Sequence, residues 1–224
     1  MSWLLHIDTA VQLGSICLSK GDQALGITIN ATQNDHASWL QPAIKKLLEE
    51  HDVLLNDLAA ICVSAGPGSY TGLRVSMATA KGLCYALQKP LITISTLKMM
   101  AAAASNLTAD FFCPMIDARR MEVFTAVYDK ALNELIKPHN LILAEADFSN
   151  FLEKGKLVVF GNGSEKFKPF LSHPNILFEK VEATSEQMVT LSYQKYIKND
   201  FADLAYTEPF YGKEFYSPAL KNIK

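Results

Sequence analysis

Two aspartates close apolar segments at matching places in the sequence. Asp8 follows the run WLLHI, and Asp117 follows the run CPMI, each with a further apolar segment after it. Paired aspartates at strand ends can hold a magnesium ion together with the phosphate groups of a nucleotide. The alternative is that each aspartate only caps the turn after its strand. We therefore treat Asp8, Thr9 and Asp117 as candidate nucleotide-binding residues, with both alternatives open. The residues after Asp8 read TAVQ, without the glycine that a phosphate-binding turn favours.

A glycine-rich loop follows a later apolar segment, because residues 64–74 read SAGPGSYTGLR. Glycine permits close backbone approach and proline stiffens the chain, so the loop is expected to contact a phosphate, another subunit or its own sheet. Gly72 precedes Leu73 and Arg74 rather than the Lys-Ser or Lys-Thr of a P-loop, and the glycine spacing differs from the dinucleotide fingerprint. Ser69 and Thr71 can cap a following helix. The loop residues we single out are Gly66, Pro67, Gly68, Ser69, Thr71 and Gly72.

Other common catalytic patterns do not occur in the sequence. The five histidines never pair at metal-ligand spacing, and no serine lies in a Gly-x-Ser-x-Gly motif. The four cysteines lie far apart among apolar neighbours, which predicts reduced thiols in the core. They are Cys17, Cys62, Cys84 and Cys113.

Size and charge limit the classes of protein to which the chain can belong. Its 224 residues suit one large domain or two smaller lobes. A formal charge of −2 gives no electrostatic footprint for binding nucleic acid without a partner. There is no signal-peptide pattern and no apolar run long enough to span a membrane, so we expect a cytoplasmic protein.

Hydrophobic periodicity predicts an alternation of strands and helices. A helix over residues 72–87 is apolar around most of its circumference, so it needs burial on two sides. Ala78 and Gly82, four residues apart, would let a second helix come close. The other expected elements are strands at 3–7, 14–19, 24–30, 59–63, 91–94, 123–128 and 157–160, and helices at 34–50, 96–104, 164–170 and 185–198.

The central segment resembles a known protein family. SAGPGSYTGLR at 64–74, followed by ATAKGL at 78–83, closely resembles the GPGSFTGLR…ATAKGL segment of the TsaB (YeaZ) family. IDTA at 7–10, STL at 95–97 and IDAR at 116–119 match the family in the same order. The resemblance extends through about residue 128 and does not cover the rest of the chain.

This resemblance implies an α/β fold of the actin/Hsp70 type, that is, a two-lobed ASKHA or ribonuclease H-like fold with a reduced C-terminal lobe. Residues 1–107 would form the N-terminal lobe, which carries the dimerisation helices, and residues 108–224 the smaller C-terminal lobe. The family is paralogous to the TsaD/Kae/glycoprotease proteins. Thr96 and Met100 stand where TsaD has its metal-binding histidines, and neither can replace a histidine ligand, so no metal is expected.

The family also implies a role as the non-catalytic scaffold and activator of TsaD in threonylcarbamoyladenosine modification of tRNA. TsaE and the tRNA would join that assembly, a homodimer would form without TsaD, and the chain alone would bind no cofactor, with ATP used by the assembled complex. The alternative is a nucleotide-hydrolysing or peptidase-like enzyme of the same superfamily. The implied partner interface consists of His36, Trp39, Leu40, Ala43, Leu47, Arg74, Met77, Ala78, Lys81, Gly82 and Tyr85.

Overall fold

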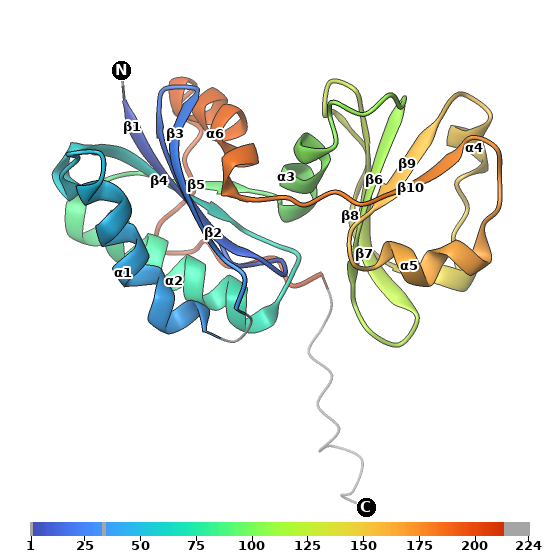
Figure 1. Ribbon diagram of the computed structural model, residues 1–224, viewed down its shortest axis with the longest axis horizontal. Coiled ribbons are helices and arrows are strands. Elements are labelled where there is room, and N and C mark those ends of the chain that lie inside the picture. Colours follow the sequence, from blue (N-terminus) through green and yellow to red (C-terminus); the bar gives the residue numbers. More distant parts are fainter. Residues whose placement is uncertain (1, 33–34, 213–224) are drawn as a thin grey trace, which may run out of the picture.

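The computed structural model describes residues 2–32 and 35–212, which form two lobes side by side (Figure 1). The first lobe is built on a five-stranded sheet with the order β3-β2-β1-β4-β5. β1 pairs antiparallel with β2 and parallel with β4, which in turn pairs parallel with β5. The strands are β1 (Trp3–Asp8), β2 (Gly14–Lys20), β3 (Gln23–Asn30), β4 (Leu58–Ser64) and β5 (Leu91–Ile94).

Two helices cover one face of this first sheet (Figure 1). They are α1 (His36–Glu49) and α2 (Tyr70–Leu87), and a 3-10 turn, η1 (Leu55–Asp57), follows α1. The apolar residues of α1 recur at helical spacing and are buried against the sheet. Alternate strand residues such as Leu5 and Ile61 face these helices, whereas Leu4 and Cys62 face the opposite side. Both faces are buried, which explains why β1 and β4 are continuous apolar runs.

The second lobe repeats a mixed five-stranded sheet, with the order β10-β9-β6-β7-β8. Its outer face packs on short helices through aromatic side chains such as Phe148 and Phe167. The strands are β6 (Phe111–Asp117), β7 (Glu122–Asp129), β8 (Glu134–Ile142), β9 (Leu157–Phe160) and β10 (Ile176–Glu179). The short helices are η2 (Leu143–Glu145), α4 (Ser149–Leu152), α5 (Ser164–Phe167) and η3 (Lys168–Phe170). Our sequence prediction omitted β8 and β10.

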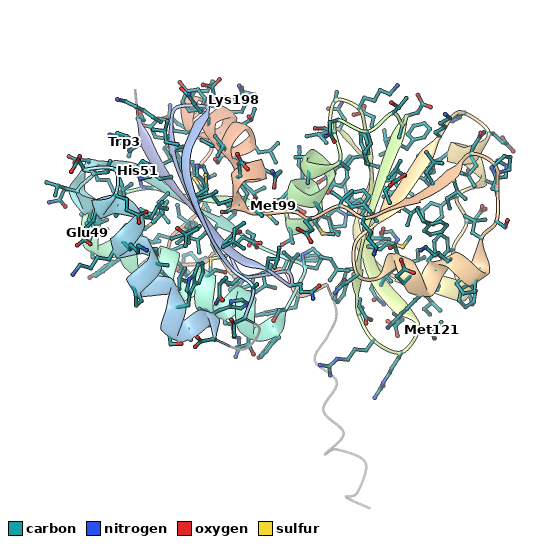
Figure 2. All side chains as sticks on the ribbon, in the orientation of Figure 1. Trp3, Glu49, His51, Met99, Met121 and Lys198 are labelled. Carbon is teal, nitrogen blue, oxygen red and sulfur yellow. The ribbon has the colours of Figure 1, made fainter. Side chains whose placement is uncertain are left out.

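Helix α3 (Thr96–Ala103) joins the two lobes (Figure 1). Its apolar side chains belong to one buried cluster that also contains Ile92 of the first sheet and Phe112 of the second. Met99, a fully buried member of this cluster, lies between the lobes in Figure 2. The lobes therefore share a continuous core.

The chain returns to the first lobe after β10. There η4 (Ser185–Gln187) and α6 (Met188–Ile197) cover the face of the first sheet opposite α1 and α2. The buried His6 ring on β1 fixes this helix, because it hydrogen-bonds Ser19 Oγ at 2.8 Å and Ser192 Oγ at 3.2 Å. The prediction that residues 108–224 form the C-terminal lobe is thus wrong for residues 185–212, which pack on the first lobe. The second face of the first sheet is apolar, and η4 and α6 cover it. Residues 213–224 lie outside the described residues.

Residues 202–212, which we call the C-terminal strap, continue along the first lobe without a helix or extended strand. Ala202 forms an isolated antiparallel bridge with Leu91 at the edge strand β5. Further on, Phe210 N donates a hydrogen bond to Ala65 O at 2.7 Å. The prediction that the aromatic end of the chain packs across a surface is confirmed up to residue 212, whereas Phe215 and Tyr216 lie outside the described residues.

Candidate functional site

The glycine loop between β4 and α2 packs against the turn that follows β1. A Cβ atom at Gly72 would lie 1.8 Å from Thr9 O, and one at Gly68 would lie 2.4 Å from Ala10 O, so both positions require glycine. Ser69 N donates to Ala10 O at 2.8 Å, and the Thr9 hydroxyl donates to Gly72 O at 2.6 Å. The sequence left open whether this loop contacts a phosphate, another subunit or its own sheet. The contact observed is with the chain itself, at the turn after β1.

The loop is held equally firmly at its other end. Gly66 N donates to Thr96 Oγ1 at 3.1 Å, and Thr96 N donates to Gly66 O at 2.9 Å. The Gly66–Pro67 peptide is cis. Ser69 caps α2, since its Oγ accepts a hydrogen bond from Gly72 N at 3.2 Å, which confirms the predicted cap. The loop consequently fixes both the position and the direction in which α2 leaves the sheet.

Asp8 and Thr9 are fully buried and do not line the cleft between the lobes. Asp8 Oδ1 accepts hydrogen bonds from the Ser64 hydroxyl and from Ala10 N, whereas Asp8 Oδ2 has no partner among the described residues. Burial raises the pKa of Asp8 to about 6. A magnesium–phosphate group does not fit here, because the packed glycine loop closes the approach to this carboxylate. The prediction that Asp8 and Thr9 contact a nucleotide is therefore wrong.

Asp117, the third candidate, does line the cleft at the end of β6. Its Oδ1 lies 2.5 Å from Lys166 Nζ and accepts a hydrogen bond from Arg119 N at 2.7 Å. Partial burial opposes ionisation, but Lys166 and the hydrogen bond from Arg119 N together outweigh it and hold the pKa of Asp117 below its ordinary value. This carboxylate is thus already paired with a cation of its own lobe.

The cleft itself has a volume of about 1700 Å³ and has walls from both lobes. The turn after β1, the glycine loop and the first turn of α2 contribute from one side. The turn between β6 and β7 and Asn162 contribute from the other side. Four of the loop residues predicted from the sequence border the cleft on the first-lobe side, although they do not hold a phosphate in the manner of a P-loop. They are Gly68, Ser69, Thr71 and Gly72.

The outward face of α2 carries small residues. Ala78 and Gly82 are exposed, and a Cβ added at Gly82 would meet no atom within 4 Å. Tyr85, one turn further on, is 74% exposed. Four other predicted interface residues are buried in the core instead, so the prediction is wrong for them, because the strongly apolar side of a helix is the side that folding buries. These residues are Leu40, Ala43, Leu47 and Met77.

An apolar pocket of about 620 Å³ lies beside this face, between α1, α2 and η1. Leu48, Val53 and Leu83 line it, and the 70% exposed Leu54 stands at its edge. The sequence analysis missed this pocket. The apolar run Val53, Leu54 and Leu55 between polar residues was the signal that could have indicated it.

Two predicted interface residues, Arg74 and Lys81, contact the C-terminal strap. Arg74 Nε donates to Tyr211 Oη at 3.1 Å, and its guanidinium carbon lies 4.1 Å from the centre of the Tyr70 ring. Lys81 Nζ donates to the carbonyl oxygens of Ala205 and Thr207 at 3.2 and 3.1 Å. The resemblance implied that both residues contact another protein, whereas in the structure each one hydrogen-bonds to the C-terminal strap of its own chain.

The remaining predicted interface residues lie at the start of α1. His36 lines the cleft, and its ring packs against Gly14. A Cβ atom added at Gly14 would lie 2.6 Å from His36 Nδ1. Burial lowers the pKa of His36. Trp39 is half-buried and packs against the core beneath α1 and α2. Neither side chain belongs to the exposed strip that contains Ala78 and Gly82.

The cysteines, histidines and carboxylates form no metal site in the described part of the chain, because no three of these residues cluster. All four cysteines are buried and free, which confirms the prediction of reduced core thiols. Burial raises the pKa of Cys113 to about 12, so this thiol is not a nucleophile at neutral pH. Within residues 2–32 and 35–212, no helix is both long and apolar enough to cross a membrane.

Comparison with known proteins identifies the family. The model of the family "TsaD: tRNA N6-adenosine threonylcarbamoyltransferase" matches residues 18–206. The tRNA threonylcarbamoyladenosine biosynthesis protein TsaB of Bacillus subtilis is 33% identical over 161 residues, which cover 70% of this chain and 69% of that protein. The Escherichia coli TsaB protein is 25% identical, with 93% of each chain covered.

The fold agrees with this sequence similarity. The solved structure of YeaZ from Pseudomonas aeruginosa superposes with a TM-score of 0.84 at 24% identity, covering 94% of this chain and all of that one. The predicted two-lobed actin-like fold is thereby confirmed. The SAGPGSYTGLR segment, the two-sheet architecture and these similarities agree, and the chain belongs to the TsaB (YeaZ) branch of the TsaD family.

Proposed function

We propose that this chain acts in threonylcarbamoyladenosine modification of tRNA as a non-catalytic subunit that binds a TsaD-type partner and holds it in an active arrangement. The names of its curated relatives support the pathway. The observation that carries the proposed role is the outward face of α2, where Ala78 and Gly82 are exposed beside an apolar pocket.

Small residues one helical turn apart let two helix backbones approach closely, and bulky residues next to them can then fill holes on the other helix. On α2, Ala78 and Gly82 supply the flat strip, and Tyr85 supplies a large apolar group beside it. The pocket lined by Leu48 and Leu83 supplies a hole. The strip with its adjacent projection matches the requirements of a helix-on-helix interface, and the pocket opens on the α1 side of α2. Without the partner, the same face would close a homodimer.

The polar groups of the chain support a non-catalytic role. Asp8 is fully buried beneath the glycine loop, and Asp117 is paired with Lys166. Thr96 uses its hydroxyl to hold Gly66 N, and Met100 is nearly buried in the core that joins the lobes. We therefore assign the transfer chemistry, and the use of ATP, to the assembled complex with a TsaD-type protein, a TsaE-type protein and tRNA.

Reconstitution of the modification tests this proposal. A TsaD-type protein from the same genome, its other pathway components and a cognate tRNA are assayed for threonylcarbamoyladenosine by mass spectrometry, with and without this chain. We expect product to form only when the chain is present, and Gln194→Leu, an exposed change on α6, to support the same yield as the wild type. An equal yield without the chain would overturn the proposed function.

A further inference from the structure

Hydrogen bonds fix the backbone of the turn at residues 203–207 of the C-terminal strap, which we call the Tyr206 turn. Asp203 Oδ1 accepts from Ala205 N at 2.8 Å and from Tyr206 N at 3.0 Å. Thr207 N donates to Asp203 O at 2.9 Å. An aspartate side chain that accepts from the backbone two residues further on favours a defined turn. The shape of this turn is therefore set within its own five residues.

Lys81 of α2 ties the Tyr206 turn to the first lobe. Its ammonium group donates to Ala205 O at 3.2 Å and to Thr207 O at 3.1 Å, the carbonyl groups on either side of Tyr206. Leu204, inside the turn, packs against the core beneath α1 and α2. The position of Tyr206 relative to α2 is thus set by contacts before and after it in the chain.

The side chain of Tyr206 is exposed although its backbone is held. Its exposed fraction, 85%, is the highest among the large apolar and aromatic side chains in the described part of the chain. The ring therefore adds almost nothing to the core of this protein. A fixed backbone that presents an aromatic ring to solvent suits a binding anchor, because little conformational freedom remains to be lost on binding.

The strap and α1 lie on opposite flanks of α2. Helix α1 packs over β2 and β3, and α2 packs over β4. The strap is bridged to β5 through Ala202 and Leu91, at the other edge of the same sheet. Residues three and four apart share a helix face, so Lys81 lies beside Ala78 and Gly82. The outward face of α2 consequently has α1 on one side and the Tyr206 turn on the other.

Other exposed side chains gather at the same surface. Tyr85 and Leu54 are the next most exposed large apolar or aromatic side chains after Tyr206 among the described residues. Tyr85 lies one turn after Lys81 on α2, and Leu54 stands at the edge of the pocket between α1 and α2. An exposed apolar patch of this kind marks an interaction surface. The three side chains thus border one surface, which extends from α1 across α2 to the strap.

We propose that Tyr206 is an anchor residue of the partner-binding surface, and that its ring packs against the helix that a TsaD-type protein lays along α2. This inference rests on the proposed function, which supplies the partner. Packed helices lie about 8–10 Å apart, so side chains of a helix seated on Ala78 and Gly82 reach a ring held beside Lys81. The strap, which covers the first lobe, therefore also contributes to binding.

Calorimetric titration of a TsaD-type protein from the same genome with the full chain tests the anchor. Tyr206→Ala should raise the dissociation constant about 30-fold, which corresponds to the loss of about 2 kcal/mol at an aromatic hot spot. The melting temperature of the isolated chain should not change, because the ring is exposed. Phe170→Ala removes an exposed ring from the second lobe and should bind as tightly as the wild type.

A second pair of variants tests whether the fixed turn positions the ring. Asp203→Ala removes the acceptor of Ala205 N and Tyr206 N but keeps the ring, so it should weaken binding by about 2- to 10-fold, the cost of ordering a side chain on binding. Asp203→Ala/Tyr206→Ala should bind no more weakly than Tyr206→Ala alone, because the turn acts through the ring. Additive losses would contradict this positioning role.

The remaining outcomes separate the anchor from the proposed function. Wild-type affinity of Tyr206→Ala, or an equal loss in Phe170→Ala, would overturn the anchor. If Tyr206→Ala bound normally while Ala78→Glu disrupted the complex, the anchor would be refuted and the proposed function would stand. If the wild-type chain bound no TsaD-type protein, both would be refuted.

Discussion

Replacing Gly82 should change stability and association in opposite directions. Gly82 lies in the interior of α2, and a Cβ there meets no atom within 4 Å. Alanine is favoured over glycine in a helix interior by about 1 kcal/mol. Gly82→Ala should therefore raise the free energy of unfolding by about 1 kcal/mol, and the melting temperature by about 2–4 °C for a chain of this size.

Association with the TsaD-type partner should weaken when the same position becomes bulky. Extra carbons in a tightly packed contact cost about 1–3 kcal/mol. Gly82→Leu should therefore raise the dissociation constant by about 5- to 150-fold, since 1.4 kcal/mol is tenfold. Urea unfolding of the isolated chain and calorimetric titration with the partner measure the two effects separately. Gln194→Leu, on α6 at the other face of the sheet, is the control and should leave association unchanged.

Two results would refute this reasoning. If Gly82→Ala lowered the stability of the isolated chain, the space beside Gly82 would not be open. If Gly82→Leu bound the partner as tightly as the wild type, the strip containing Ala78 and Gly82 would not be the contact surface. A loss of binding in the Gln194→Leu control would show that the assay reports stability and not contact.

Further predictions concern buried charge and the strap. Burial lowers the pKa of His6 from 6.5 to about 3, so the stability that depends on neutral His6 is complete above pH 6.5 and is lost as the pH falls toward 3. Asp8, with its pKa raised to about 6, has the opposite sign, so Asp8→Asn should stabilise the fold by up to about 3 kcal/mol at pH 7, with the gain shrinking below pH 6. In Asp8→Asn, where Asp8 no longer titrates, the free energy of unfolding in urea should be about 2 kcal/mol lower at pH 5 than at pH 7, because His6 stays neutral in the folded chain. An equal free energy of unfolding at the two pH values would contradict the buried neutral histidine. Lys81→Ala should expose residues 202–212 to limited proteolysis and cost about 1–2 kcal/mol, whereas Lys45→Ala, an exposed control, should do neither.

Most of the fold could be predicted where local pattern and burial agree. β1, β4, α1 and α2 follow apolar periodicities that a single sequence displays. β8 could not be found in this way, because Lys137, Pro138 and His139 interrupt its alternation, as is usual on an edge strand. The return of α6 to the first lobe depends on which sheet face lacks cover, and that information is not local.

The candidate site could likewise be predicted only where residue types carry the information. The glycine loop and the strip of Ala78 and Gly82 were recognisable from residue types, because glycine and alanine at fixed spacing permit close backbone contact. The apolar side of α1 could not be separated from a partner surface by pattern alone, and Leu40 proved to be core. The contacts of Lys81 with the strap use backbone carbonyl groups, which carry no sequence signature.

The central claim is that α2 presents its outward face to a TsaD-type partner. The most direct test is light scattering coupled to size-exclusion chromatography of Ala78→Glu mixed with that partner. Ala78 is exposed, so the charge should leave the isolated chain folded and as stable as the wild type. With this variant, both the complex and the homodimer of the chain alone should dissociate. A complex of wild-type mass and affinity would contradict the account.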